Sequence, residues 1–545
     1  MNFRRFWYVG LFICSFAYAQ VNEVVPFTSS NLPIVVINTD GQTIADDPKI
    51  IVDMGIIDNG TSRNNLSDPF NDFSGKIGIE IRGSSSQMFP KKQYGFETVD
   101  EEGEGTAVSL LGMPEEEDWI LFAPYNDKSL MRDALAYGIA RQLGSYAPRT
   151  KYCEVVLNGV YQGVYVLIEK IKRDKNRVDI NKLDPDEVSG NNLTGGYMFK
   201  IDKTTGGSGD GWNSTYDPPG GTFQSVFFQY ETPDAEDMVP EQAAYLKGFM
   251  KAFEDNLSSS DFDDPVDGYT KYIDVNSFID YFIMQELTKN VDGYRLSTFM
   301  YKKRDSDGGK IFMGPVWDFN LGFGNANYCT SGGPEGFVVT DFNSVCPEDS
   351  WLIPFWWRRL MQDPAFDTKL AARWAELRAT TLQKSEINGY IDSVYTLLNA
   401  EAQQRNFKAW KVLGNYVWPN YYIGASFTDE VNWMKQWISQ RIDWLDQYMP
   451  LQITDVETES VSGHVTASPN PFSSDVNFTY TLQRPGEVNL RIFDSMGRTV
   501  NSASIEHASP GEYTYTWNAH SQQGMYFYQV RQGVSKLGSG KLSKR

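Results

Sequence analysis

Three polar segments of the sequence carry side chains suited to binding a phosphate group or a metal ion. The first runs from 82 to 92 and reads RGSSSQMFPKK, with Arg82 and Ser84 before Lys91 and Lys92. A Gly/Ser loop between two strands offers backbone N–H groups and hydroxyls to phosphate oxygens, and a lysine on the next strand adds positive charge. Gly/Ser hairpins usually only turn the chain, so this segment alone leaves both interpretations open.

The second segment, 290–297, reads NVDGYRLS and follows a strongly apolar stretch that we predict to be helical. Asp292 lies in this loop, where a carboxylate can orient a hydroxyl nucleophile and accept its proton. Ser297, five residues later, could reach a metal ion bound beside Asp292. The alternative is a solvated loop aspartate.

The third segment, 314–320, reads GPVWDFN and follows a predicted strand. Oxygen ligands from Asp318 and Asn320 suit Mg²⁺, which takes one or two protein groups together with phosphates and waters. An aspartate that only ends a strand is the alternative. The order of the three segments along the chain is more informative than any one of them, because it matches the order of glycine loop, strand lysine, catalytic Asp and D-F-G in protein kinases.

The positions of the histidines narrow the possible chemistry. The only three, His464, His507 and His520, lie near the C-terminus, and residues 20 to 450 contain none. This excludes Ser-His-Asp and Cys-His mechanisms and histidine-ligated zinc from the main part of the chain. Metal-assisted phosphoryl transfer, glycoside hydrolysis by paired carboxylates, and no catalysis at all remain.

Length and charge bound the architecture and the partners. The 545 residues are too many for one hydrophobic core, so we expect at least two domains. The formal net charge of −21 argues against a nucleic-acid partner, because phosphate backbones require a basic surface. After the N-terminal segment, no stretch approaches the ~20 apolar residues of a membrane helix.

Residues 1–19 have the features of a secretory signal peptide. Arg4 and Arg5 give the positive start, an apolar run follows, and Ala17-Tyr18-Ala19 supplies a small-x-small cleavage pattern. We therefore expect a protein exported from the cytoplasm. An oxidising compartment allows a disulfide, and Cys329 with Cys346 is the expected pair because both lie in one Gly-rich region.

The elements that position these segments indicate an α+β main domain over residues 20–450. Strand patterns around residues 33–58, the hairpin that contains KIGIEIRG and KKQYGFE, and a second hairpin turning at Asn158-Gly159 precede a helical region from 239 to 289. Helical spacing also extends from Lys128 to Leu143. Residues 351 to 450 are helical and rich in tryptophan, and we expect these Trp side chains to form core.

The composition changes after Pro450. Residues 451–464 form a polar linker, and residues 465–545 contain short alternating strands that predict a small β-sandwich. The motifs ASPNPF, FD with MGR, GMY and a basic end resemble the type A C-terminal sorting domain of the type IX secretion system of Bacteroidetes-type bacteria. This resemblance implies contact with the secretion machinery and passage through the periplasm to the cell surface or the extracellular space.

The main domain resembles the spore-coat protein H (CotH) kinase family. The stretches that carry the resemblance are RGSSSQMFPKKQYGFE, DWILFAPYNDKSLMRDALAYGIARQLG, YAPRTKYCEVVLNGVYQGVYVLIEKIKRDKNRVDI, TGGYMFKIDK and GPVWDFNLGFGN. The resemblance implies an atypical protein-kinase-like fold that uses ATP with Mg²⁺ or Mn²⁺ and phosphorylates exposed serines on partner proteins.

The same resemblance assigns roles to individual residues. It implies that Asp292 is the catalytic aspartate and Asp318 a metal ligand, that Lys91 or Lys92 contacts phosphate, and that Glu169 and Lys170 lie near the nucleotide. The chain departs from the family pattern at two positions, because Asn320 stands where a second Asp is frequent and Ser297 replaces a kinase-like Asn.

These two departures keep alternatives open. Our leading hypothesis is an exported ATP-dependent serine kinase. The alternative is a catalytically silent kinase-like protein that serves as a surface scaffold or in adhesion, and a glycoside hydrolase is the third hypothesis, motivated by the aromatic residues and the carboxylates.

Overall fold

The computed structural model describes residues 23–204, 210–449, 465–482, 485–494, 499–519, 523–532 and 535–545. The expected signal peptide (1–19), the expected linker (451–464) and the MGR part of the sorting motif (496–498) lie outside the described residues. The chain divides into two compact units, Met1–Ile453 and Thr454–Arg545.

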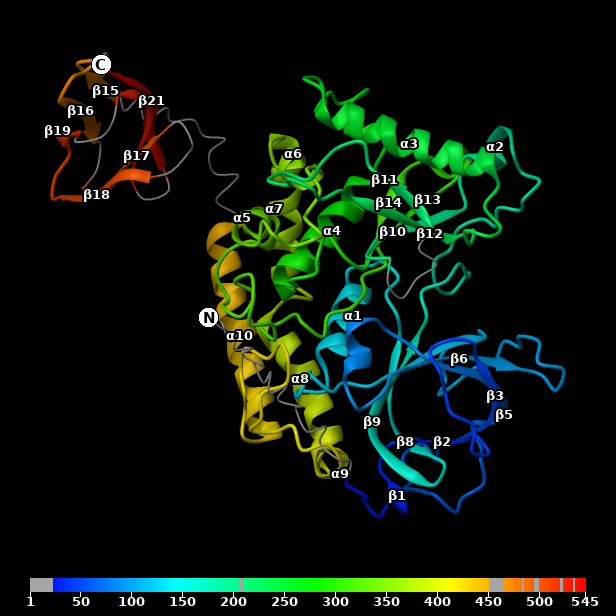
Figure 1. Cartoon of the computed structure of the whole chain (residues 1–545). Coiled ribbons are helices and arrows are strands. Elements are labelled where there is room, and N and C mark those ends of the chain that lie inside the picture. Colours follow the sequence, from blue (N-terminus) through cyan, green and yellow to red (C-terminus); the bar gives the residue numbers. More distant parts are fainter. Residues whose placement is uncertain are drawn as a thin grey trace, which may run out of the picture. The chain divides into compact units, whose positions relative to one another are not determined.

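The first half of the main unit contains a closed barrel in which the strand order is β2-β3-β5-β6-β7-β9-β8. A parallel pairing of β2 with β8 closes it, while the other neighbours are antiparallel. Figure 1 shows these strands in blue to cyan. Their bounds, with the short pair β1 and β4 outside the barrel, are β1 (Ser29–Ser30), β2 (Ile34–Asn38), β3 (Ile50–Ile57), β4 (Asn64–Asn65), β5 (Phe73–Ile81), β6 (Tyr94–Val99), β7 (Asp118–Phe122), β8 (Thr150–Leu157) and β9 (Val160–Glu169).

The alternating sequence pattern explains the barrel. Side chains of successive residues point to opposite faces of a strand, so one face of each strand fills the interior. Ile77, Ile79, Phe96 and Trp119 are among the buried side chains of this core. Both predicted hairpins are present, and β8 turns into β9 at Asn158 (φ 50°) and Gly159 (φ 75°), as a two-residue turn with two positive φ angles requires.

A second sheet of five strands follows in the order β11-β12-β10-β13-β14. All its pairings are antiparallel. The strands are β10 (Tyr197–Ile201), β11 (Gly211–Asn213), β12 (Phe227–Thr232), β13 (Thr298–Lys302) and β14 (Ile311–Met313), and the helices that accompany them are α1 (Arg132–Gln142), α2 (Gly190–Leu193), α3 (Pro240–Ser258) and α4 (Val275–Thr288). In Figure 1 this sheet is green and lies close to α3.

Two helical predictions need correction at their bounds. The helix expected from Lys128 begins only at Arg132, because the Asp127 carboxylate accepts hydrogen bonds from the backbone N–H of Ser129 and Arg132 and turns the chain there. The helical region expected from 239 to 289 is two helices, α3 and α4. Asp274 caps the second by accepting from the Ser277 N–H at 2.8 Å.

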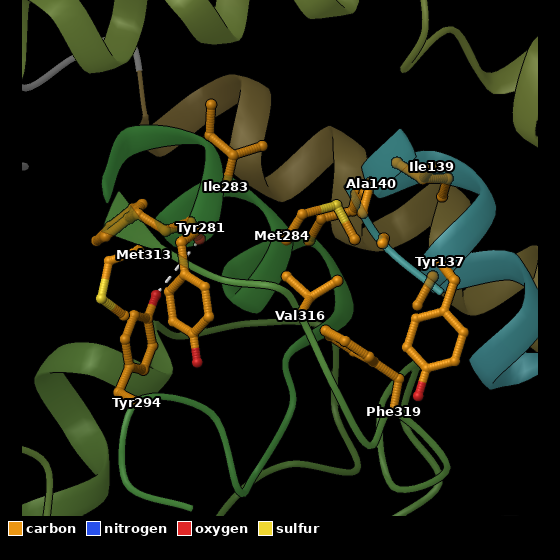
Figure 2. Close-up of a cluster of buried hydrophobic side chains, with 14 of the residues drawn as sticks. Tyr137, Ile139, Ala140, Tyr281, Ile283, Met284, Tyr294, Met313, Val316 and Phe319 are labelled. Atoms are coloured by element: carbon orange, nitrogen blue, oxygen red, sulfur yellow. Dashed lines mark hydrogen bonds between the residues drawn. The ribbon is translucent and has the colours of Figure 1, made fainter. Parts of the chain in front are cut away.

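Helices α1 and α4 share one hydrophobic core with the segments that follow them. Figure 2 shows Tyr137 of α1 beside Phe319, and Tyr281 of α4 beside Tyr294. The ring centroids are 6.1 Å apart in the first pair and 5.9 Å in the second, and the rings are nearly perpendicular, a favoured arrangement of aromatic pairs. Tyr294 and Phe319, which lie close in sequence to Asp292 and Asp318, are therefore fixed in the core.

Most of the region from 351 to 449 is helical, and several of its tryptophans lie in the core. Trp356, Trp357, Trp374 and Trp437 are each at most 2% exposed. The helices of this region and the one before it are α5 (Val338–Val345), α6 (Trp356–Leu360), α7 (Pro364–Arg378), α8 (Lys384–Asn399), α9 (Ala402–Ala409) and α10 (Phe427–Tyr448). The disulfide between Cys329 and Cys346, the pair expected from the sequence, joins the loop before α5 to the end of that helix.

Glu286 of α4 and Arg441 of α10 form a fully buried ion pair at 3.0 Å. The Glu286 carboxylate also accepts hydrogen bonds from the hydroxyl of Tyr294 and from the backbone N–H groups of Val338 and Val339, each at 3.0 Å. One carboxylate thus ties together α4, α5, α10 and the loop that carries Asp292.

The C-terminal unit consists of two antiparallel sheets around one core. The strand orders are β15-β16-β19 and β18-β17-β20-β21. Phe478 from the first sheet and Leu490 and Val530 from the second are buried in a common cluster, so the unit is a small β-sandwich. Its strands are β15 (Thr466–Ser468), β16 (Asp475–Leu482), β17 (Gly486–Asp494), β18 (Thr499–His507), β19 (Gly511–Asn518), β20 (Gly524–Gln532) and β21 (Ser535–Lys544).

Across the described parts of the chain, no helix has the length and apolar content needed to span a membrane.

The buried pair between Glu286 and Arg441 gives a stability prediction. Glu286→Ala leaves the Arg441 charge buried without its carboxylate, so we expect the free energy of unfolding of the main unit to fall by about 3–5 kcal/mol. Chemical denaturation followed by tryptophan fluorescence measures this change. The exposed pair between Lys384 and Asp443 provides the control, since Asp443→Ala should cost less than about 1 kcal/mol. Equal effects of the two substitutions would contradict the prediction.

Candidate active site

A cleft of about 710 Å³ in the main unit collects residues from all three polar segments. Its walls come from the end of β5, the end of β10, the loop after α4 and the loop after β14. Seven of the residues singled out in the sequence line it, and they are Arg82, Ser84, Lys170, Asp292, Ser297, Asp318 and Asn320. More than 200 residues of chain separate the first of them from the last.

The Gly/Ser loop forms one wall. Gly83 has φ 102°, and a Cβ added there would lie 2.1 Å from the Ser86 hydroxyl oxygen, so the turn requires glycine. The Gln87 amide donates hydrogen bonds to the Gly83 carbonyl and to the Asp46 carboxylate, both at 2.7 Å. These contacts hold the loop closed beside the cleft.

Arg82 supplies a cation at this wall. Its guanidinium carbon lies 5.5 Å from the ring centroid of Trp317, the residue that precedes Asp318. Burial lowers the pKa of Arg82, and the negative charge of Asp318 opposes this shift. Arginine remains a cation in proteins, so Arg82 places a positive charge beside Asp318 in the cleft.

The loop that carries Asp292 is tied directly to the Asp318 segment. The Asn290 side chain accepts a hydrogen bond from the Asp292 N–H at 3.2 Å and donates one to the Asp318 carbonyl at 3.1 Å. The Asp292 carboxylate accepts a hydrogen bond from Arg295 at 2.7 Å. Asp292 is 19% exposed, so its carboxylate is held by the protein but accessible from the cleft.

Helix α1 holds the other acidic segment. The backbone N–H of Phe319 donates to the Asp133 carboxylate at 2.7 Å, and the N–H of Asp318 donates to the Tyr137 hydroxyl at 3.2 Å. Asp318 itself has φ 62°, a left-handed backbone conformation that glycine adopts readily and that asparagine and aspartate adopt more often than other residues. The left-handed conformation directs the chain so that Asp318 faces the cleft while Phe319 enters the core.

The cleft concentrates negative charge. Burial, followed by repulsion from Asp292, raises the pKa of Asp318 to about 6. Burial, followed by repulsion from Asp318, also raises the pKa of Asp133 well above its usual value, and its Oδ2 atom has no hydrogen-bond partner. Carboxylate and amide oxygens in such a place fit a hard divalent cation, whose charge would relieve this repulsion.

A metal ion in the cleft would need ligands beyond the protein. Among the residues the structure describes, three carboxylates with oxygens within 4.8 Å of one another occur only at Glu116, Glu117 and Asp118. That group is outside the cleft and all three carboxylates pair with Lys172. The cleft therefore matches a metal that is completed by phosphates and waters, the usual arrangement for Mg²⁺.

Three of the residues singled out in the sequence do not line the cleft. Lys91 is buried and donates to the Val164 carbonyl and the Asn406 side chain, which attaches α9 to the barrel. Lys92 donates to the Gln87 carbonyl at the back of the Gly/Ser loop. Glu169 is fully buried and pairs with Arg149 at 2.8 Å.

Several charged residues of the cleft were not identified from the sequence as site residues. Lys200, Asp202 and Lys203 line it at the end of β10, and Asp133 lines it from α1. The first three belong to the stretch TGGYMFKIDK, where a strand pattern ends in alternating charges. The charged end of this strand pattern is the signal that the sequence offers. It does not reveal which part of the fold the strand end faces.

The raised pKa of Asp318 predicts a pH-dependent stability effect. A folded-state pKa above the unfolded value of ~3.9 means that the charged form destabilises the fold above pH ~6. In metal-free protein at pH 8, Asp318→Asn should therefore raise the free energy of unfolding by about 1–3 kcal/mol, since Asn is neutral and also accepts a positive φ.

Denaturation of both proteins at pH 8 and at pH 4.5 tests this prediction. The difference should shrink at the lower pH, where Asp318 is largely protonated. A difference that stays constant with pH would assign the effect to the backbone conformation instead of the charge.

Comparisons with known proteins identify the families that the two parts of the chain match. The family model described as CotH kinase protein matches residues 79–445, and the model described as secretion system C-terminal sorting domain matches residues 467–542. The sorting domain indicates export to the cell surface or extracellular space.

Individual relatives are more distant. Inner spore coat protein H of Bacillus subtilis (strain 168) is 24% identical over 248 residues, which are 46% of this chain and 59% of the relative. The chain thus spans less than two thirds of that relative's length.

A solved structure, Pseudomonas fluorescens alkylpurine DNA glycosylase AlkC bound to DNA containing an abasic site analog, covers 36% of this chain and 55% of its own at 11% identity. Its TM-score of 0.13 is too low to support any argument about the fold. The two family matches are the informative comparisons, and the first spans more than half of the sequence. The chain therefore belongs to the CotH kinase protein family and ends in a secretion sorting domain.

Proposed function

We propose that this protein is an exported serine kinase that transfers the γ-phosphoryl group of ATP to partner proteins with the help of Mg²⁺ or Mn²⁺. One observation carries the proposal. A single cleft collects Asp292, Asp318, Arg82 and the Gly/Ser loop from three distant segments of a CotH-family chain. Phosphoryl transfer depends mainly on positioning and electrostatic stabilisation, which such a cleft provides.

Each side chain has a distinct task in this proposal. Asp292 orients the serine hydroxyl and accepts its proton, because its carboxylate is fixed by Arg295 and accessible from the cleft. Asp318 and Asn320 would hold the metal, with Ser297 beside them. When bound, the metal would neutralise charge on the phosphates. Arg82 and the backbone N–H groups around Ser84 bind phosphate oxygens.

Lysines at the ends of β9 and β10 fit phosphate contact better than Lys91 and Lys92, which do not line the cleft. Lys170 and Lys203 line the cleft, and the charge of Lys203 acts directly on Asp318. Lys200 lies there too, paired with Glu231 at 2.8 Å. We therefore assign phosphate contact to these lysines in place of Lys91 and Lys92.

The cleft keeps the negative charge that a metal needs despite the two departures from the family pattern, Asn320 and Ser297. Asn320 is neutral, but Asp202 also lines the cleft and its charge raises the pKa of Asp318. Burial raises the pKa of Asp202 as well, and the Ser297 N–H donates a hydrogen bond to it. Asp202 thus provides the second carboxylate that Asn320 does not.

Asp292→Asn tests the kinase proposal. The mature protein is incubated with ATP labelled in the γ-phosphate, Mn²⁺ or Mg²⁺, and a set of serine-containing peptides. Because general-base positioning contributes about 10²–10⁴-fold, the substitution should lower the transfer rate by at least about 100-fold while ATP binding persists. Phosphoserine detection by mass spectrometry measures the product.

Two outcomes would contradict the proposal. Transfer that is unchanged in Asp292→Asn would remove this residue from the chemistry. An intact protein that binds ATP with neither metal and labels no serine, including its own, would favour the catalytically silent surface scaffold.

The sorting domain gives a separate prediction about location. Deletion of residues 465–545 should leave the protein in the periplasm, because the signal that the secretion machinery recognises is lost. Fractionation of producing cells and antibody labelling of their surface measure the result. Surface display of the shortened chain at the level of the full chain would contradict the assignment.

A further inference from the structure

The disulfide between Cys329 and Cys346 is connected to the Asp292 carboxylate through two charged side chains. Cys346 ends α5, and Asp349 follows it in a turn in which the Asp349 N–H donates to the Cys346 carbonyl at 3.1 Å. The Asp349 carboxylate accepts a hydrogen bond from Arg295 at 3.1 Å, and Arg295 donates to Asp292 at 2.7 Å.

Arg295 has the features of a side chain held in one orientation. It is 2% exposed, and its guanidinium carbon lies 4.2 Å from the ring centroid of Phe342 on α5. Two further N–H groups donate to the backbone carbonyls of Val291 and Trp351. Because the planar guanidinium reaches Asp292 and Asp349 together, a shift of Asp349 must change the position of Asp292 or break one contact.

The other half of the disulfide reaches the same site. Cys329 follows Tyr328, whose ring stacks on Trp418, a residue of the cleft wall, with ring centroids 6.2 Å apart. Burial raises the pKa of the Tyr328 hydroxyl, and the negative charge of Asp292 adds to this shift. The disulfide therefore joins two segments, around 328 and around 349, that both lie near Asp292.

We propose that Arg295 is a positioning residue for Asp292 and that the Cys329–Cys346 disulfide fixes it through Asp349. The Asp292 site is then fully assembled only in the oxidised chain, which means after export from a reducing cytoplasm. The inference rests on the proposed kinase function for its kinetic consequence. Its structural consequence, an ordered 290–297 loop, is independent of that function.

The alternative is that the disulfide only stabilises the main unit. Closing a loop of this size contributes about 3 kcal/mol in the chain-entropy model, so loss of the disulfide lowers stability in either case. The two alternatives differ in whether the effect on Asp292 passes through Asp349, which a double-mutant cycle measures.

The test uses the mature protein and four variants, measured below their melting temperatures. Arg295→Met, Asp349→Asn and Cys329→Ser/Cys346→Ser each interrupt the connection, and the fourth variant combines Asp349→Asn with both serines. Each should lower kcat by about 10- to 100-fold, as expected for a displaced catalytic group, with the ATP dissociation constant changed less than about 3-fold. In the Asp349→Asn background, removal of the disulfide should cause little further loss.

Reduction of the wild-type protein gives the same test without substitution. Dithiothreitol transfers two electrons and two protons to the disulfide, which yields two thiols and the cyclic disulfide of the reagent. The reduced protein should match the double-serine variant. Asp446→Asn is the control, since it breaks an Arg–Asp pair between α7 and α10 and should leave kcat unchanged.

Hydrogen exchange provides the readout that does not need catalysis. Backbone amides of residues 290–297 should exchange faster in the reduced protein and in Arg295→Met, and stay unchanged in Asp446→Asn. If the wild-type protein transfers no phosphate, the kinase proposal fails but the exchange result still decides this inference. An equal kcat loss on disulfide removal with and without Asp349, or unchanged exchange in residues 290–297, would overturn it.

Discussion

The candidate site depends on hydrogen bonds that hold two acidic segments against each other despite their mutual repulsion. On α1, the Asp133 carboxylate accepts a hydrogen bond from the Phe319 N–H, and the Tyr137 hydroxyl accepts one from the Asp318 N–H. The Asn290 side chain donates to the Asp318 carbonyl and so joins this segment to the loop of Asp292. Without these bonds, two carboxylates in a half-buried cleft would move apart or take up protons. The aromatic contacts of Tyr137 with Phe319 and of Tyr281 with Tyr294 keep the backbone bonds in place, so the site is an extension of the core (Figure 2).

These hydrogen bonds explain how acidic side chains stay close together in a part of the fold that disfavours their charged forms. The raised pKa values of Asp133 and Asp318 show that the protein holds these groups in a place that disfavours their charged forms. A cation that binds there would gain affinity from the repulsion it relieves, so the unfavourable electrostatics of the metal-free fold and the proposed affinity for a metal–nucleotide complex have one physical origin. The positive charges of Arg82 and Lys203 offset part of the same repulsion.

Much of the fold could be predicted from the sequence because its signals are local. Alternating strands, the Asn158-Gly159 turn and the tryptophans at helical spacing depend on neighbours in the chain, and they appear as expected. Hydrophobic periodicity places the start of α1 four residues too early. It does not reveal that the Asp127 carboxylate accepts a hydrogen bond from the Arg132 N–H and turns the chain before the helix. Closure of the barrel by β2 and β8 was also invisible, since it joins strands more than 100 residues apart.

The same distinction between local signals and long-range contacts applies to the candidate site. The loop motifs that contain Asp292 and Asp318 could be found from residue types, and both reach the cleft. The lysines that line the cleft could not be found in this way, because the direction of Lys91 and Lys92 depends on α9 and on the loop they support.

The most direct test of the central claim is calorimetric titration of the mature protein with ATP and Mn²⁺, repeated on Asp318→Ala. We predict binding by the intact protein and its loss in the variant, whereas equal binding by both, or none by the intact protein with either metal, would contradict a metal–nucleotide site in this cleft.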